Sequence, residues 1–547
     1  MTKSSYISRR QLLRTGIAAG AATTVGLPAL AGCSNEGRGS AEGSQAENDA
    51  VRLPAYLPYA GVKPDLVGAN GVSDAFLAYP ADPVQATDGP PGDGKPVAAL
   101  TMSGSPPPPA VGRNAFWQGL NERLGLPLSV QLVPRADFTD RFQTAVAGDQ
   151  LPDLFSFTMD LPSLPAMLAK MAVDLTPLLS GDAVAKYPFL ANVPTDSWRQ
   201  TVYGGKIFGV PIPRGAALSS ILYGRKDLLA ARGLDAAPDS WESFHALLRE
   251  ATGGKVNTWA LAAVPLAAIR QMFGIPNTWA EDGGRLTSAY EAERQQEALQ
   301  AGRKLVAEKL VHLDAFAVDQ NQRKTWIANG TTTFVEDTFS AWHGFAQLAE
   351  PNRIEVTAYP PPLAEGGGAA KIWLGSPSHN ITAISIKSEA RAEALLAVLN
   401  HLAAPFGTAE HLYKSFGEPG VHHELKGTDP VLTERGKIET PLSLGYLAEG
   451  PWPLYAPGKA EAVQLEYDVM KSMVPDGLRN PAHGLFSQTQ SRKGAQLGGV
   501  LEDLESDILQ GRKPVSEWAG AVATWKKNGG DTIRDELQQA LDVRNGG

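Results

Sequence analysis

Two short clusters bring together residue types that could do chemistry. His422, His423 and Glu424 are types that ligate metal ions. Glu336 with Asp337 could supply the acid and the base of a glycosidase. Neighbouring residues point in different directions, and on a strand they face opposite sides of the sheet, so neither cluster converges on one point. The chain also lacks a G-x-S-x-G elbow, a phosphate-binding loop, an H-E-x-x-H motif and a dinucleotide fingerprint. We therefore expect a binding protein and not an enzyme, with no metal and no cofactor.

Aromatic residues on loops are the other candidates for chemistry. A tryptophan in a large chain is usually core, because burying its ring is favourable. Trp452 departs from that rule, since Pro451 and Pro453 exclude it from a regular element. The aromatic residues on stretches flanked by Gly or Pro are Trp279, Trp373, Trp452 and Tyr455. We expect these four on loops, where a ligand can reach them.

Length and charge narrow the class of protein. The 547 residues suffice for two or three domains, and 43% hydrophobic with 20% charged residues indicates a folded, globular chain. The formal net charge of −9 argues against nucleic acid or an anionic membrane as the main partner.

The N-terminus is typical of an export signal. Residues 8–14 (SRRQLLR) resemble the twin-arginine motif, and the Ala/Gly-rich stretch after them is too short and small-sided for a membrane span. Residues 30–33 (LAGC) resemble a bacterial lipobox, in which Cys33 is lipidated after cleavage. We predict a signal peptide at 1–32 and a flexible tether at 33–50; a plain cleaved signal with an incidental cysteine stays an alternative.

The first half of the chain alternates strand and helix patterns. Residues 51–96 are rich in Pro and Gly and predict an irregular extension lying over a lobe. The predicted elements after it are strands at 97–102, 128–133 and 154–157 and helices at 114–124 and 137–148. This alternation predicts βαβ units in a mainly parallel sheet, whose ligands lie beyond the carboxyl ends of its strands. Ser103 and the segment 157–160 are therefore candidate ligand contacts.

Residues 203–229 predict a crossing between two bodies. Pro211 and Pro213 each fix the backbone and remove a donor, so no central strand or helix passes through them. We interpret the stretch as a hinge between two α/β lobes. In the second lobe, Asp239 or Ser240 is expected to begin a helix, and Gly529-Gly530 to divide the C-terminal helix.

Four short segments are similar to the signatures of one bacterial protein family. The segment 147–154 (AGDQLPDL) is similar to the family's sGdlPDv, and 203–211 (YGGKIFGVP) to its dGKiYGlP. Further on, 222–227 (LYGRKD) is similar to lyYnkdl and 238–242 (PDSWE) to P-x-TWdE. In this order and spacing, the four segments resemble the bacterial extracellular solute-binding proteins of family 1, the receptors of sugar-importing ABC transporters. The likeness covers roughly residues 97–540.

The resemblance implies an α/β, two-lobed periplasmic-binding-protein fold of type II, with the ligand cleft between the lobes. In each lobe we expect a mainly parallel sheet flanked by helices. By the likeness, residues 371–386 carry two strands and form the second crossing. The predicted first lobe is then 97–213 with 371–417, and the predicted second lobe is 214–370 with 418–547.

A sugar presents apolar faces and a rim of hydroxyls, so its site needs aromatic platforms and planar polar groups. Carried over from the family, the cleft residues are Phe157, Asp160, Arg214, Trp342 and Trp452. The family often has Trp or Tyr where this chain has Phe157, and its usual Gly before the tryptophan is replaced at 340–341. Arg214 has a second interpretation as a salt bridge that spans the hinge.

The resemblance implies a lipid-anchored receptor of an ABC importer that binds a sugar or oligosaccharide and passes it to membrane permease subunits. It would be a monomer on the outer face of the cell membrane, which it contacts only through the lipid on Cys33. Two rivals stay open: an exported, lipid-anchored carbohydrate-active enzyme, and an interaction protein that has the same fold but no ligand.

Overall fold

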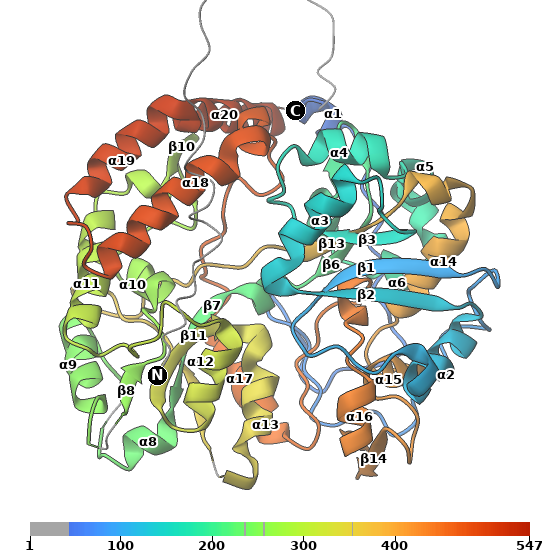
Figure 1. The fold of residues 1–547 in the computed structure, drawn as a ribbon, viewed down its shortest axis with the longest axis horizontal. Helices are drawn as coiled ribbons and strands as arrows, with labels where there is room; N and C mark the ends of the chain where they lie inside the picture. Colours follow the sequence, from blue (N-terminus) through green and yellow to red (C-terminus); the bar gives the residue numbers. More distant parts are fainter. Residues whose placement is uncertain (1–42, 235–236, 255–256, 353, 547) are drawn as a thin grey trace, which may run out of the picture. The chain divides into compact units, whose positions relative to one another are not determined.

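The first lobe is organised around a five-stranded sheet in the order β2-β1-β3-β13-β6 (Figure 1). The structure is a computed structural model that describes residues 43–546 except 235–236, 255–256 and 353. The strands are β1 (Val97–Ser103), β2 (Leu128–Pro134), β3 (Leu154–Phe157), β6 (Val210–Pro213) and β13 (Ser378–Ile384). The first three are parallel, as the alternation of strands and helices predicted.

Helix α2 (Ala115–Leu124) shows how local sequence makes these elements. The Asn114 side chain accepts a hydrogen bond from the backbone N–H of Trp117 and so caps the first turn. Phe116, Leu120 and Leu124 recur at helical spacing and are all buried. Burying each such side chain stabilises the fold by about 1.5–3 kcal/mol, so the buried face and the cap together define the helix. Helices α3 (Phe138–Ala147) and α4 (Leu164–Met171) follow the next two strands.

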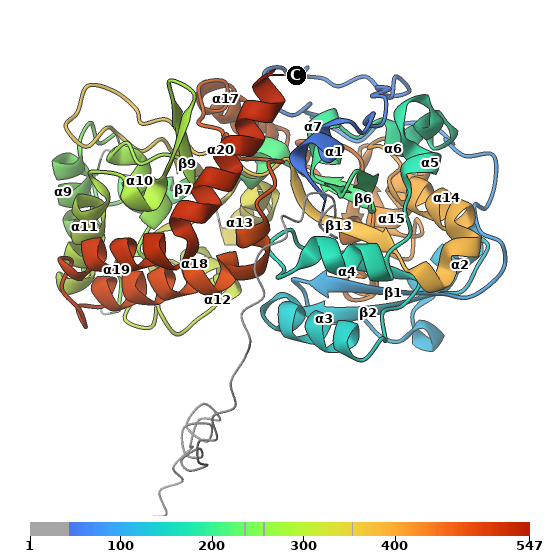
Figure 2. The same ribbon diagram turned by 90° about the horizontal axis from the view of Figure 1, so that it is seen from above.

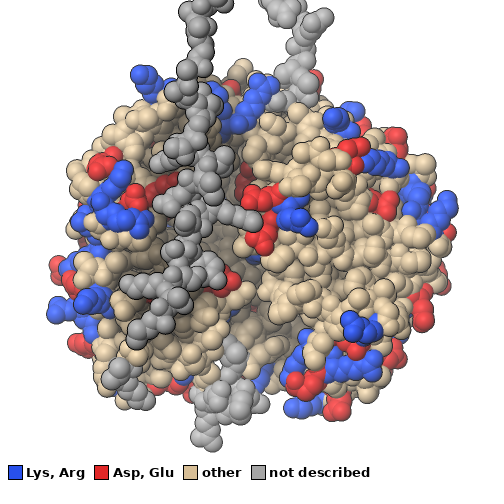
Figure 3. All heavy atoms as spheres, in the orientation of Figure 1, with Lys and Arg blue, Asp and Glu red and all other residues tan. Residues whose placement is uncertain are grey.

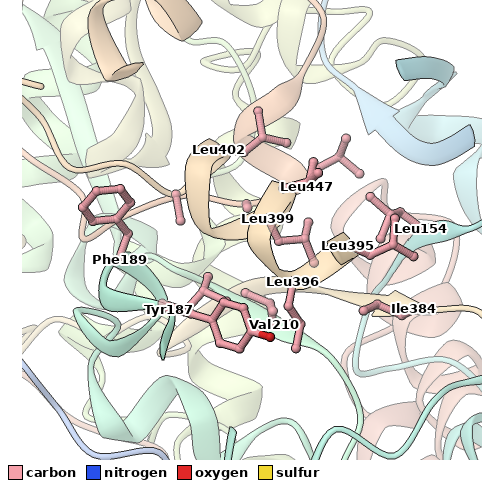
Figure 4. Packing of buried hydrophobic residues seen from close by; sticks show 14 of the residues in the cluster. Leu154, Tyr187, Phe189, Val210, Ile384, Leu395, Leu396, Leu399, Leu402 and Leu447 are labelled. Atoms are coloured by element: carbon pink, nitrogen blue, oxygen red, sulfur yellow. The ribbon is translucent and has the colours of Figure 1, made fainter. Parts of the chain in front are cut away.

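The core of the first lobe joins strands from distant parts of the chain. Leu396 and Leu399 of α14 (Ala392–Leu402) pack in one cluster with Leu154 of β3, Val210 of β6 and Ile384 of β13 (Figure 4). None of these five side chains is exposed. The strands that adjoin the second lobe are therefore anchored firmly in the core of the first.

The segment from 418 to 448 also packs on the first lobe, which corrects the predicted boundary after residue 417. Glu439 of α16 (Glu434–Glu439) accepts a hydrogen bond from the backbone of Ala115, at the start of α2. Leu442, Leu444 and Leu447 are buried in the first lobe's core. These leucines carry the segment inward because the first lobe offers the apolar surface that they cover. The chain leaves this lobe only near residue 449.

The second lobe contains a four-stranded sheet in the order β12-β7-β11-β8 (Figure 1). Its strands are β7 (Ser220–Arg225), β8 (Trp259–Leu261), β11 (Thr332–Thr338) and β12 (Val356–Tyr359). The helices around it include α9 (Trp241–Ala251), α10 (Leu266–Met272), α11 (Gln295–Ala307), α12 (Gln320–Ala328), α13 (Trp342–Asn352) and α17 (Ala460–Met473). Ser240 caps α9, as predicted.

Both sheets are mixed, and in each of them one strand runs against the direction that the other strands share. Strand β13 is antiparallel to β3 and β6, and β7 is antiparallel to β11 and β12. The crossover rule fixes direction only within a βαβ unit. Strands that enter a sheet from the other lobe, as β7 and β13 do, are free of that rule.

Three C-terminal helices form a layer of their own on the second lobe (Figure 2). They are α18 (Gln488–Leu509), α19 (Glu517–Trp525) and α20 (Asp531–Gly546). Their core includes Trp279 and Leu286 from the hairpin of β9 (Trp279–Asp282) and β10 (Arg285–Ser288). The predicted break at Gly529 is confirmed, since its φ of 150° is not helical. Among the described helices, none is long and apolar enough to cross a membrane.

Two segments that join the lobes are hydrogen-bonded to each other. After β6 the chain crosses at residues 214–219, and the backbone N–H groups of Arg214 and Gly215 both donate to the carbonyl of Pro377, at 2.9 and 3.1 Å. Pro377 belongs to the second crossing, residues 375–377, which leads into β13. The stretch 371–386 therefore holds one strand where two were predicted, because its first part spans the gap between the sheets.

The predicted extension at 51–96 is irregular, and it covers both lobes where one was expected. Leu53 packs against the core of the first lobe and Leu66 against that of the second. Glu410, which is buried, accepts hydrogen bonds from the backbone N–H and the hydroxyl of Thr87, at 2.8 and 2.7 Å. Such anchoring holds a segment that has no helix and no ladder of its own.

The end of the predicted tether is ordered. Ser44 and Glu47 form a reciprocal capping box that starts the short helix α1 (Gln45–Asp49). The Asn48 side chain accepts a hydrogen bond from Gly205 of the first lobe at 3.0 Å. Helix α1 also lies beside α20 of the second lobe (Figure 2). Residues 1–42, with the twin-arginine motif and Cys33, lie outside the described residues.

Candidate ligand-binding site

A cavity of about 680 Å³ lies between the two lobes. Its volume falls in the range of about 300–1,000 Å³ that is usual for ligand sites. The first lobe contributes the loop after β3 and the start of α4, including Asp160 and Leu164. The second lobe contributes the β9–β10 hairpin with Trp279, the residues that follow it and one face of α18. Two residues predicted from the sequence, Asp160 and Trp279, thus line one cavity from opposite lobes.

Helix α18 presents a narrow stripe to this cavity. Gln490, Gly494, Gly498 and Glu502 follow each other at intervals of four residues and lie on one helix face. The two glycines leave space between the polar side chains at the ends of the stripe. A Cβ built on Gly498 would lie 3.7 Å from the hydroxyl of Tyr290. The open volume therefore depends on small residues in the middle of a long helix.

Aromatic rings form the wall of the second lobe. Tyr290 and Trp525 both line the cavity, with their ring centroids 5.4 Å apart in an edge-to-face arrangement. Trp518 holds Tyr290 from behind, since its indole N–H donates to the Tyr290 carbonyl at 3.2 Å. Burial, together with the carboxylate of Glu502, raises the pKa of Tyr290, so its hydroxyl stays neutral and can donate a hydrogen bond.

The first lobe faces that wall with polar groups. Asp160 is exposed, so its carboxylate is available to accept hydrogen bonds. At the edge of the cavity the lobes touch directly, because the backbone N–H of Ser163 donates to the Ser491 carbonyl at 2.8 Å. Ser163 has a φ of 55°, a left-handed conformation that turns its N–H toward α18. The structure therefore has the lobes in contact around the cavity.

Arg214 and Trp452, two further predicted residues, lie together in a different place. The Arg214 guanidinium stands 4.4 Å from the centre of the Trp452 ring, within the range of a cation–π contact. It is also 3.8 Å from the carboxylate of Glu449, which Lys414 contacts at 2.7 Å. Burial lowers the pKa of Arg214 and the Glu449 carboxylate opposes that effect. The salt bridge considered for Arg214 is therefore present.

A second cavity, of about 440 Å³, is lined by Arg214 and Trp452. The N-terminal extension supplies part of its wall, including Tyr56, Tyr59 and Phe76. Neither Asp160 nor Trp279 lines it. The predicted ligand residues are thus divided between two cavities.

Phe157 and Trp342 belong to the core, and we remove them from the candidate site. Phe157 has no exposed surface, because all four residues of β3 are buried. Trp342 is 3% exposed, its indole N–H donates to the Ala462 carbonyl at 2.9 Å, and its ring packs against Tyr223. At the first residue of α13 the ring points into the lobe, where apolar neighbours cover it.

Three more predicted residues satisfy their polar groups within the protein. The Ser103 hydroxyl donates to the Ser105 carbonyl at 2.7 Å, and the Trp373 indole donates to the Ile275 carbonyl at 2.9 Å. The Tyr455 hydroxyl donates to Asp429 at 2.8 Å. None of the three lines either cavity. Trp373 and Tyr455 lie outside the named strands and helices, as predicted, whereas Ser103 is the last residue of β1.

The fold and its cavity define a class of protein, a two-lobed binding protein of type II. The structure superposes on the alginate-binding protein AlgQ2 without calcium ion with a TM-score of 0.63, at 16% identity, over 84% of this chain and 99% of that chain. That likeness establishes the fold alone. It confirms the predicted fold class.

Sequence comparison gives the family. The description "Bacterial extracellular solute-binding protein" belongs to the family that matches residues 109–405, more than half of the chain. The chain is 21% identical to lipoprotein LipO of Bacillus subtilis (strain 168) over 452 residues, which cover 77% of this chain and 88% of LipO. It is 22% identical to the polygalacturonan/rhamnogalacturonan-binding protein YtcQ of the same organism over 446 residues, 76% of this chain and 85% of YtcQ.

The chain belongs to the bacterial extracellular solute-binding protein family. The predicted family is confirmed. The family is one of solute-binding proteins and not of enzymes. This agrees with the sequence, which lacks the catalytic motifs named above.

Proposed function

We propose that this protein binds an oligosaccharide in the cavity between the lobes and delivers it to the permease of an ABC importer. The observation that carries the proposal is the pairing of Asp160 on one lobe with the rings of Trp279 and Tyr290 on the other, across one cavity. Aromatic rings suit the apolar faces of sugars, and carboxylates and amides suit their hydroxyls. The name of YtcQ, a polysaccharide-binding relative, supports the same class of ligand.

Ligand binding and closure of the lobes are coupled in this proposal. A ligand that contacts both walls only when the lobes are together shifts the equilibrium toward the closed form. The hydrogen bond between Ser163 and Ser491 belongs to that form, because its two partners lie on opposite lobes. The closed form is then the species that the permease would receive.

Anchoring by a lipid on Cys33 is part of the proposal. The lipobox-like residues 30–33 support it, as does the name of lipoprotein LipO. Mass spectrometry of the mature protein from membranes should show a diacylglycerol-modified N-terminal Cys33. A Cys33→Ser variant should leave the membrane fraction. A mature chain that begins elsewhere, without lipid, would remove this part of the proposal.

Isothermal titration calorimetry of the soluble chain against a panel of tetrasaccharides tests the main proposal. The panel holds maltotetraose, xylotetraose, galactotetraose and tetragalacturonate. We expect at least one to bind, and Asp160→Ala to weaken that binding at least about tenfold, because the variant removes a first-lobe contact. The matched control Asp140→Ala, an exposed residue of α3 outside the cavity, should bind normally.

The panel also separates the two rivals. A carbohydrate-active enzyme would return shortened saccharides, whereas a receptor returns its ligand intact. An interaction protein without a ligand would show no binding and no rise in thermal stability with any saccharide. Either result would contradict the proposed function.

A further inference from the structure

The charged side chains that line the 680 Å³ cavity indicate which charge its ligand can have. The charged side chains that line it are Asp160, Arg199 and Glu502. Arg199 is the one cation in this lining, and it shares the carboxylate of Asp49 on α1 with Arg544, the two guanidiniums lying 3.9 and 3.6 Å from it. Within the described ranges, neither Asp160 nor Glu502 forms an ion pair. Among the described residues that line the cavity, two unpaired carboxylates thus face one guanidinium, which Asp49 already engages in part.

The neighbouring histidine does not add a second positive charge. His483 lines the same cavity, and burial together with the nearby charge of Arg479 lowers its pKa. Asp196 opposes this effect as the smaller contribution. His483 is therefore a neutral hydrogen-bonding group at pH 7.

The N-terminus of α18 is another place where an anion would bind, but its donors are occupied. Ser487 caps the helix and accepts from the N–H of Gln490 at 2.9 Å. The N–H and the hydroxyl of Thr489 donate to the carboxylate of Glu536, both at 2.8 Å. A carboxylate of the protein itself thus takes the position at which an acidic ligand would gain from the helix dipole.

The face of the molecule shown in Figure 3 does not compensate for these charges. On the face shown in Figure 3, acidic and basic side chains are interspersed over both lobes without a broad basic area among the described residues. Salt screens exposed charges that lie more than about 8–10 Å apart at physiological ionic strength, so the groups lining the cavity decide its preference.

We infer that the ligand is a neutral oligosaccharide, and that Asp160 and Glu502 act as specificity residues that exclude uronic acid sugars. Both carboxylates accept hydrogen bonds from sugar hydroxyls. A uronate in the same cavity would place its own carboxylate near them, where the only lining cation, Arg199, is already engaged in part by Asp49, and this is unfavourable. This is discrimination by repulsion as well as by contact. The inference rests on the proposed function and separates this chain from relatives named for alginate or polygalacturonan.

The test compares neutral and acidic tetrasaccharides on the same protein. Galactotetraose and tetragalacturonate differ mainly in their carboxylates, and calorimetry at low salt gives a Kd for each. We expect wild type to bind the tightest neutral tetrasaccharide at least about tenfold more tightly than tetragalacturonate. In the double variant Asp160→Asn, Glu502→Gln, this ratio should shrink about tenfold or more, and added salt should also shrink it in wild type.

A matched double variant controls for overall charge. Asp140→Asn with Glu424→Gln removes two exposed carboxylates outside the cavity, and its ratio should equal that of wild type. Tetragalacturonate binding as tightly as the best neutral sugar, or a ratio unchanged in the Asp160 and Glu502 variant, would overturn the inference and leave oligosaccharide binding intact. Folded wild type that binds no saccharide would overturn the proposed function and the inference with it.

Discussion

Replacing Gly498 with leucine should stabilise the fold while it weakens ligand binding. Gly498 lies in the middle of α18 on the stripe that lines the 680 Å³ cavity. A Cβ there would be 3.7 Å from the Tyr290 hydroxyl, which is ordinary contact, so the helix accepts a side chain without strain. The rest of the leucine must then extend into space that we assign to the ligand.

The gain in fold stability and the loss of ligand affinity can be estimated separately. Leucine in place of glycine inside a helix gains about 0.8–1 kcal/mol in helix propensity. If the leucine displaces about 60 Å² of ligand from the wall, binding loses about 1.5 kcal/mol at about 25 cal/mol per Å². That loss is slightly more than tenfold in Kd. Variants that weaken binding by damaging the fold would lower stability instead.

Urea unfolding and calorimetry with the best saccharide of the panel measure both quantities. Gly499→Leu is the matched control, because a Cβ there meets no atom within 4 Å and the residue does not line the cavity. It should gain the same stability and bind normally. Normal binding by Gly498→Leu, or an equal loss in both variants, would refute the placement of the ligand beside α18.

Three further predictions concern the hinge, the half-buried Glu336 and the N-terminal extension. Gly375→Ala should lower the free energy of unfolding by about 1–3 kcal/mol, since its Cβ would fall 2.4 Å from the Cβ of Leu218 where the two crossings meet. Burial raises the pKa of Glu336 from 4.5 to about 7, so the folded state keeps a proton that the unfolded chain has lost. The stabilisation that this group provides is fully present below about pH 4.5 and is lost as pH rises through about 7. Urea unfolding at several pH values should show this loss as a fall in the free energy of unfolding, and Glu336→Gln should flatten it. Glu410→Ala should cost about 2–4 kcal/mol, because it leaves the two donors of Thr87 without a partner, and hydrogen exchange should rise at residues 84–88.

Each of these predictions has a control or a contrary result. Gly344→Ala, where a Cβ meets open space in α13, should not destabilise the fold, so equal losses at Gly375 and Gly344 would contradict the hinge argument. If the pH dependence of the free energy of unfolding persists in Glu336→Gln, another group causes it, which would contradict the prediction. Glu424→Ala removes an exposed carboxylate and should leave stability and hydrogen exchange unchanged, in contrast to Glu410→Ala.

Local sequence predicted the elements of the first lobe because their signals are local. The apolar strands at 97–103 and 128–134 and the capped helix between them are defined by residues within a few positions of each other. The direction of some strands was harder to predict from the sequence. Strand β13 pairs with strands more than 160 residues earlier in the chain, and no βαβ unit connects it to them.

Sequence rules indicated only some of the residues that line the 680 Å³ cavity, because others reach it through long-range packing. The rule that ligands lie beyond the carboxyl ends of strands pointed to Asp160, which lines the cavity. Trp279 lines it too, but as the first residue of strand β9 and not on the predicted loop. Tyr290, Gln490 and Glu502 were missed, because α18 reaches the cavity only through tertiary packing. The recurrence of polar and glycine residues at every fourth position along α18 was the sequence signal that could have indicated the residues of this helix.

Trp342 shows the limit of a motif. Its place in the family pattern suggested a ligand contact, but the start of α13 turns the ring into the core against Tyr223. The motif fixes where the residue lies along the chain, whereas packing of the helix fixes where the ring points.

The most direct test of the account is a crystal structure with the tightest-binding saccharide of the panel. We predict density for the sugar in the cavity between Asp160 of the first lobe and Tyr290 of the second, with Gly498 beside a ring. Sugar density in the 440 Å³ cavity against Trp452 and Arg214, with the cavity beside α18 empty, would contradict it.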